Sequence, residues 1–277
     1  MIWDIQNRLQ NAGVPGMPRN RLKNSKTPGM LVAQYRDIQN KTSSAKFVLI
    51  TATKYFDLLP LVYVSVLRVR QYFPGLEWII VKSNYIENTS IFNETGDFNW
   101  IHELEYRGVE KSEAGHIEKN IALNYIRNNP SIINGSGWLY LLDGDNAAPE
   151  FTGFDSIRQM DTNITYWANQ ELCSRKVKRY TKRPDDYLDI MRSNSSVSKR
   201  TFRKILLHKI DTGAFIMSLN AWRAVDALSP LDFEAVYEHD GLYFTEFVYR
   251  LWQLKFNVRK LKDGTVKLFY NAFRCHP

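Results

Sequence analysis

The sequence predicts an α/β fold with a mostly parallel sheet. Residues 46–81 give a strand, a helix and a strand in turn: the apolar run KFVLITAT, the helix-length segment Leu58–Phe73 and a second run, WIIV. This order is typical of a parallel sheet. Later, the five apolar residues Trp138–Leu142 run directly into Asp143, which indicates a strand buried on both faces in the middle of the sheet. The length of 277 residues fits one large domain or two small ones, and a hydrophobic fraction of 44% excludes wholesale disorder.

The elements follow one another with recognisable boundaries. Residues 1–45 are polar and rich in Gly and Pro, so we expect an irregular N-terminal arm before regular structure begins at residue 46. A helix over 117–129 is ended by Pro130. The remaining expected elements are a strand at Ile164–Ala168, a mobile basic loop at 174–204, a strand at Thr212–Leu219, a short helix at Ala221–Ala227, a helix with one apolar face at Asp240–Leu254, and a strand and tail at 265–277.

Charge and composition narrow the class of protein. The net charge of +8 is unevenly spread: the segment 174–204 alone holds eleven basic and three acidic residues, whereas the middle of the chain is acidic. The most apolar stretch, Leu58–Val69, contains Pro60 and is too short to span a bilayer, and the N-terminus lacks a signal-peptide pattern. We therefore expect a soluble, cytoplasmic protein. Two cysteines, Cys173 and Cys275, cannot make a disulfide framework, and neither has a neighbouring Cys or His at the spacing of a metal site.

The segment Asp143-Gly144-Asp145-Asn146 is the most informative motif. Two carboxylates at the end of a buried strand form a hard-oxygen site suited to a divalent cation. The glycine lets either a diphosphate or the backbone approach closely. A short D-x-D is common by chance, so a solvated turn is the alternative interpretation. Its place at the carboxyl edge of the sheet, where open α/β proteins bind ligands, favours a binding site.

Several blocks of the sequence resemble nucleotide-sugar glycosyltransferases of the GT-A fold, and most closely glycosyltransferase family 43, the β-glucuronyltransferases and their xylan-associated plant relatives. The similar blocks keep the family's order and are 51–54, 119–123, 143–146, 164–167 and 212–219. The resemblance implies a single Rossmann-like GT-A domain over 46–277 with helices on both faces of the sheet. Its nucleotide-sugar half would be 46–150 and its acceptor half 151–277.

The resemblance also implies donor-binding residues. Asp145 would coordinate Mn²⁺ (or Mg²⁺) on the diphosphate of a UDP-sugar, and Asp143 would contact the ribose, the metal or its water shell. The family's middle aspartate is here Gly144, so that carboxylate is lost or supplied elsewhere. Lys119 stands where the family has a basic residue near the uridine diphosphate, with a solvated helix lysine as the alternative.

Further contacts to the nucleotide are expected from the first two strands and the C-terminus. Thr51, Thr53 and Tyr55 lie where the family holds uracil, although Tyr55 could equally be a core residue. We assign Asn84 to the same site. Of the C-terminal residues that could reach the diphosphate, Arg274 is the preferred candidate, with Asn271 and His276 as others.

On the acceptor side, the alignment places Asp240 at the position of the catalytic base of an inverting transfer, with Glu238 as a substitute. A carboxylate at a helix start is also a common N-cap. Asp211 matches an acceptor-contacting aspartate, and Trp167 is a second candidate contact to the glycan acceptor. A lone histidine, His116, reads as a surface or capping group near a helix start.

Two other functions are compatible with parts of the sequence. A sugar-phosphate nucleotidyltransferase would carry a Gly-rich basic signature after the first strand, which TATKYFDLLP lacks. A nucleic-acid-binding protein would use the basic segment 174–204, but that segment has few aromatic residues and no binding motif, so no nucleic-acid partner is expected. We expect a UDP-sugar donor, with xylose or glucuronic acid favoured, and the basic loop beside the acceptor. A soluble enzyme of this kind would suit a bacterium or a virus acting in host cytoplasm.

Overall fold

The computed structural model describes residues 44–54, 56–83, 98–108, 115–168, 170–172, 212–233, 241–262 and 264–270. All of them belong to one compact unit, Ser43–Pro277. The expected N-terminal arm, except for its last two residues, and the basic loop 174–204 lie outside the described residues.

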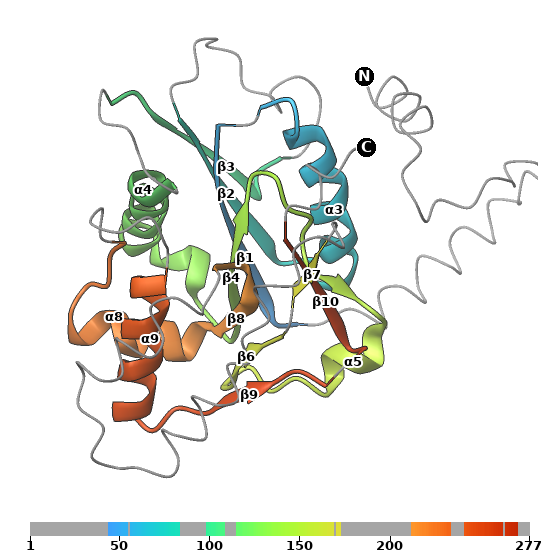
Figure 1. Ribbon diagram of the computed structural model, residues 1–277, viewed down its shortest axis with the longest axis vertical. Helices are drawn as coiled ribbons and strands as arrows, with labels where there is room; N and C mark the ends of the chain where they lie inside the picture. The colour runs from blue at the N-terminus through green and yellow to red at the C-terminus, as the bar shows by residue number, and fades with distance from the viewer. Residues whose placement is uncertain are drawn as a thin grey trace, which may run out of the picture. The chain divides into compact units, whose positions relative to one another are not determined.

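A seven-stranded sheet with the order β3-β2-β1-β4-β8-β6-β9 forms the centre of the unit (Figure 1). Its strands are β1 (Lys46–Thr53), β2 (Leu76–Ser83), β3 (Ile101–Tyr106), β4 (Gly137–Asp143), β6 (Thr165–Trp167), β8 (Phe215–Ser218) and β9 (Val258–Lys260). β8 is antiparallel to β4 and β6, whereas the other neighbouring pairs are parallel. The predicted α/β class and mostly parallel sheet are therefore confirmed, and β4 lies in the middle of the strand order, as its apolar run predicts.

Helices cover both faces of this sheet. Figure 1 shows α3 (Leu59–Tyr72) and α5 (Phe154–Arg158) on one side and α4 (His116–Asn128), α8 (Leu219–Leu228) and α9 (Gly241–Gln253) on the other. Alternate residues of β1 and β4 enter one or other of two apolar cores. Leu49 and Tyr140, for example, face α3, whereas Ile50 and Leu141 face α4.

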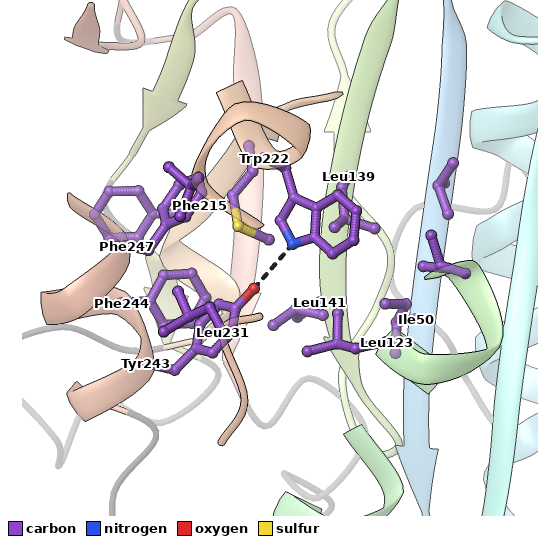
Figure 2. Close-up of a cluster of buried hydrophobic side chains, with 14 of the residues drawn as sticks. Ile50, Leu123, Leu139, Leu141, Phe215, Trp222, Leu231, Tyr243, Phe244 and Phe247 are labelled. Atoms are coloured by element: carbon purple, nitrogen blue, oxygen red, sulfur yellow. Dashed lines mark hydrogen bonds between the residues drawn. The ribbon is translucent and has the colours of Figure 1, made fainter. Parts of the chain in front are cut away.

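The core on the α4 side joins distant parts of the chain. Figure 2 shows Leu139 and Leu141 of β4 beside Leu123 of α4 and the aromatic residues of α8 and α9. Within it, the indole N–H of Trp222 donates a hydrogen bond to the Tyr243 hydroxyl at 3.0 Å. Each buried side chain of this kind contributes roughly 1.5–3 kcal/mol by leaving water. Helices α8 and α9 therefore share a core with the strand that ends in the acidic motif.

Some elements depart from the sequence-based expectation. The segment expected as one strand, Thr212–Leu219, begins as a 3-10 turn, η3 (Thr212–Ala214), and only Phe215–Ser218 extends as β8. The edge strand β3 was not expected, because IHELEY mixes charged and apolar residues and is only half-buried. A second, three-stranded sheet has the order β5-β10-β7, from β5 (Glu150–Phe151), β7 (Gln170–Leu172) and β10 (Val266–Tyr270), and a short η2 (Pro130–Ile133) precedes β4.

The helices of the described part of the chain do not have the combined length and apolar character that a membrane crossing requires.

Candidate functional site

The acidic motif lies at the carboxyl end of the central strand. Asp143 is the last residue of β4 and pairs in register with Ala52 of β1. The chain then turns, and the Asn146 amide donates a hydrogen bond to the Asp143 carbonyl at 3.0 Å. Asp143 continues the alternation of Leu139 and Leu141, which face α4. The strand thus presents the Asp143 carboxylate on the α4 side of the sheet edge.

Gly144 is required by its contact with β1. A Cβ built on Gly144 would lie 2.2 Å from Thr53 Oγ1 and 2.5 Å from Thr53 Cβ, closer than two such atoms approach in proteins. The absence of a side chain at position 144 therefore allows β1 to lie close to the motif at Thr53. A residue with a side chain at position 144 would require Thr53 or the chain itself to shift.

The Asp143 carboxylate is held by two neighbours. Lys119 Nζ, on a side chain only 3% exposed, lies 3.6 Å from Asp143 Oδ1. On the other oxygen, Asn146 Nδ2 donates a long hydrogen bond of 3.4 Å to Oδ2. The Asp143 side chain itself remains 28% exposed. It is thus oriented by the protein and still accessible to a ligand. The alternative of a solvated lysine is excluded, because α4 buries Lys119 against the motif.

Asp145 is the electrostatically perturbed group of the motif. The residue is 7% exposed, and burial, together with the negative charge of Asp143, raises its pKa to about 6. A hydrogen bond to the backbone and the positive charges of Lys119 and Lys54 oppose this shift. The negative charges of Asp143 and Asp145 repel each other, and a divalent cation bound to both carboxylates would remove this repulsion.

The donor set fits Mn²⁺ or Mg²⁺ in chemistry, since both ions prefer carboxylate oxygens and keep water or phosphate in the remaining positions. Within the described ranges, no group of three or more His, Cys, Asp and Glu side chains is arranged to hold a metal by itself.

The threonines of β1 are buried on the opposite, α3 side of the sheet. Thr51 is fully buried, and its Oγ1 accepts a hydrogen bond from the Trp78 indole N–H at 2.9 Å. Thr53 is 4% exposed and lies against Gly144. Both side chains are therefore packed inside the sheet edge, where they fix the position of β1 beside the acidic motif, and a contact of this segment with the nucleotide stays a prediction.

Trp167 is likewise a core residue and not a surface for the acceptor. It is fully buried in β6, pairs in register with Phe215 and belongs to the core on the α4 side. Lys260 Nζ lies 5.2 Å from the centroid of its ring. The prediction of a direct contact between Trp167 and the acceptor is wrong for this structure, because the indole has no exposed surface.

Six predicted site residues lie outside the described residues and stay predictions: Tyr55, Asn84, Asp211, Glu238, Asp240 and Arg274.

The structure joins two further residues of α4 to one distant residue. His116, expected as a surface or capping group, is 2% exposed and begins α4, where its ring stacks against Phe233. Asn120, next to Lys119, hydrogen-bonds the Phe233 backbone. The spacing of His116, Lys119 and Asn120 places them on one helix face. That spacing was available in the sequence, but Phe233, their shared partner more than a hundred residues away, was not.

Searches find no protein-family model and no curated protein sequence that matches the chain. Among solved structures, it is similar to S. aureus TarS 1–349 in complex with UDP-GlcNAc, with a TM-score of 0.49 and 12% identity over 82% of this chain and 58% of that one. The TarS 1–349 structure alone gives a TM-score of 0.45 at 10% identity, over 80% of this chain and 59% of that one.

A further similar structure is the mannosyltransferase PcManGT from Pyrobaculum calidifontis in complex with GDP-Man and Mn²⁺, with a TM-score of 0.43 and 10% identity over 98% of this chain and 69% of that one. The chain thus spans less than two thirds of the length of the TarS structures. TM-scores below 0.5 at such identities describe a loose likeness, which transfers neither residue roles nor an activity to this chain.

Proposed function

We propose that this protein is a metal-dependent glycosyltransferase of the GT-A type that transfers a sugar, with inversion, from a UDP-sugar to a hydroxyl of a glycan. One observation carries the proposal. Asp143 and Asp145 stand together at the carboxyl end of the central strand, and the buried ammonium of Lys119 lies 3.6 Å from Asp143. An anionic pair beside a fixed cationic group suits a divalent cation and a diphosphate bound together.

The roles proposed for the described residues follow from their positions. Asp145 and Asp143 hold the cation, and Asp143, the more exposed of the two, also reaches the ribose or the metal's water shell. A bound Mn²⁺ or Mg²⁺ would stabilise the two negative charges that develop on the departing nucleoside diphosphate. Lys119 supplies a positive charge at the same place, already desolvated by burial, so little reorganisation is needed during transfer.

The acceptor half of the proposal depends on residues beyond the described ranges. Asp240, or Glu238 in its place, deprotonates the acceptor hydroxyl as it attacks the anomeric carbon. Asp211 contacts the acceptor, and the basic segment 174–204, beside the acceptor, either attracts an acidic glycan or helps to hold the donor diphosphate. If Asp240→Asn retains transfer activity while Glu238→Gln abolishes it, Glu238 is the base.

Calorimetry with UDP and MnCl₂ tests the site directly. The wild-type protein should bind UDP only when Mn²⁺ or Mg²⁺ is present, and Asp145→Ala should abolish that binding. Asp155→Ala, which removes an exposed carboxylate from α5, is the matched control and should bind as the wild type does. Binding that is unaffected by Asp145→Ala would reject the assignment of the site.

The donor sugar is identified by slow hydrolysis. A screen with Mn²⁺ over UDP-xylose, UDP-glucuronate, UDP-GlcNAc and GDP-mannose needs no knowledge of the acceptor. We expect UDP-xylose or UDP-glucuronate to be hydrolysed fastest. Faster release of GDP than of UDP would overturn the proposed preference for uridine.

A further inference from the structure

Three residues of one turn of α4 hold a single distant residue, Phe233. Asn120 Nδ2 donates a hydrogen bond to the Phe233 carbonyl at 2.9 Å, and the Phe233 amide donates to Asn120 Oδ1 at 2.7 Å. The His116 ring stacks against the Phe233 ring at 6.1 Å and 15°. Lys119 Nζ lies 5.3 Å from the centroid of the same ring. Both the backbone and the ring of Phe233 are therefore fixed relative to the helix that carries Lys119.

A second helix fixes the Phe233 ring from elsewhere in the fold. Tyr243 of α9 stacks against it with centroids 4.1 Å apart and planes within 6°. Tyr243 in turn accepts the hydrogen bond from Trp222 and is fully enclosed in the core on the α4 side (Figure 2). Phe233 is itself only 4% exposed. The ring cannot turn away from Lys119 without disturbing α9.

The Lys119 ammonium is near both an anion and an aromatic ring. Its residue is 2% exposed, and Nζ lies 3.6 Å from Asp143 Oδ1 and 5.3 Å from the centroid of the Phe233 ring. A desolvated ammonium near an aromatic ring is attracted by the ring's quadrupole, and the attraction grows as water is excluded. A long lysine side chain has many rotamers, so such a contact also reduces the entropy lost when the ammonium is used in binding.

We propose that Phe233, clamped by Asn120, is a positioning residue that holds the Lys119 ammonium beside Asp143, ready for a nucleoside diphosphate and its cation. Phe233 does not touch the ligand and acts through Lys119. The inference rests on the proposed function for the ligand's identity, but the placement of Lys119 by Phe233 is a property of the ligand-free protein.

A double-mutant cycle measured by calorimetry with UDP and MnCl₂ tests the coupling. Lys119→Met should weaken binding about 10- to 100-fold, as expected for the loss of a charge-assisted contact. Phe233→Leu, which keeps an apolar side chain but removes the ring, should weaken it about 3- to 30-fold. The double variant should bind no more weakly than Lys119→Met. If the fold-losses of affinity of the two single variants multiply in the double variant, Phe233 acts independently of Lys119. If Phe233→Leu binds as the wild type does, Phe233 does not act on binding at all. Either result would overturn the inference.

A ligand-free readout separates this inference from the proposed function. In protein labelled with ¹³C-lysine, the Lys119 ε-methylene protons, assigned with Lys119→Arg, should show a ring-current shift that disappears in Phe233→Leu. Phe73→Leu is the matched control: it makes the same change in the core on the α3 side, against Phe47, and should leave this shift and the affinity for UDP unchanged. Loss of the shift in Phe73→Leu as well would show a general repacking and reject the specific role of Phe233. Absence of UDP binding by the wild type would reject the proposed function alone.

Discussion

At the carboxyl edge of the central sheet, polar residues on the two faces differ in how exposed they are. On the α4 face, β4 ends in Asp143, which stays 28% exposed beside Lys119. On the α3 face, β1 ends in Thr51 and Thr53, which are both buried. Thr51 accepts a hydrogen bond from Trp78, and Thr53 packs against Gly144. Since side chains alternate along a strand, the face on which a polar residue falls decides whether a ligand can reach it. The α4 face is therefore the candidate binding face, and the α3 face supports it.

The largest effect is expected from removing the carboxylate of Asp145. Asp145→Ala should weaken Mn²⁺-dependent UDP binding more than 100-fold, roughly the loss of a metal ligand. The melting temperature of the ligand-free protein should not fall, because a buried carboxylate beside Asp143 is costly to ionise. Calorimetry and thermal denaturation measure the two quantities. If Asp145→Ala lowers the melting temperature as well as the affinity, the loss of binding reflects unfolding, and the carboxylate is then not shown to bind the cation.

The contact between β1 and the acidic motif, on the α3 side, can be tested at Gly144. Gly144→Ala should destabilise the fold by about 1–3 kcal/mol, since its methyl group would overlap Thr53. Adding Thr53→Gly should recover part of this loss, which urea denaturation of the single and double variants measures. If the double variant is no more stable than an additive sum predicts, the glycine is required for another reason.

The raised pKa of Asp145 predicts that stability and metal binding depend on pH. The folded protein holds this proton up to about pH 6, whereas the ordinary value is 3.8. The contribution of Asp145 to stability is therefore full below about pH 4 and is lost as the pH rises through 6. Relative to Asp145→Asn, the free energy of unfolding of the ligand-free wild type should fall across this range. Conversely, its affinity for Mn²⁺ with UDP should rise, by up to about tenfold per pH unit below 6. A difference between the two proteins that does not vary with pH would contradict the perturbed pKa.

The smallest effect is expected on the α3 face. Thr51→Val keeps the shape of the side chain but leaves the Trp78 indole N–H without its acceptor, at a cost of about 1–2 kcal/mol. The affinity for UDP with Mn²⁺ should change less than twofold. A larger loss of affinity in calorimetry would show that the α3 face takes part in binding after all.

Local patterns predicted most of the sheet and the centre of the site. Long apolar runs marked β1, β2 and β4, because strands buried on both faces carry no alternation. The edge strand β3 escaped prediction, because it mixes charged and apolar residues and its Glu103 finds its partner, Lys82, only on the neighbouring strand β2. Trp167 was misassigned because an aromatic residue after an apolar run looks the same whether it lines a cleft or fills a core.

The sequence by itself determined the α/β class, the central strand and the acidic motif at its end, because these depend on local periodicity and on residue types that sit next to each other. The tertiary structure alone decided which motif residues can be reached, why position 144 requires a glycine, and which residues surround Lys119. Each of these depends on a contact between residues far apart in the chain, as between Gly144 and Thr53 or Asn120 and Phe233. Such pairs meet only when the elements pack, so no pattern of neighbouring residues predicts these contacts.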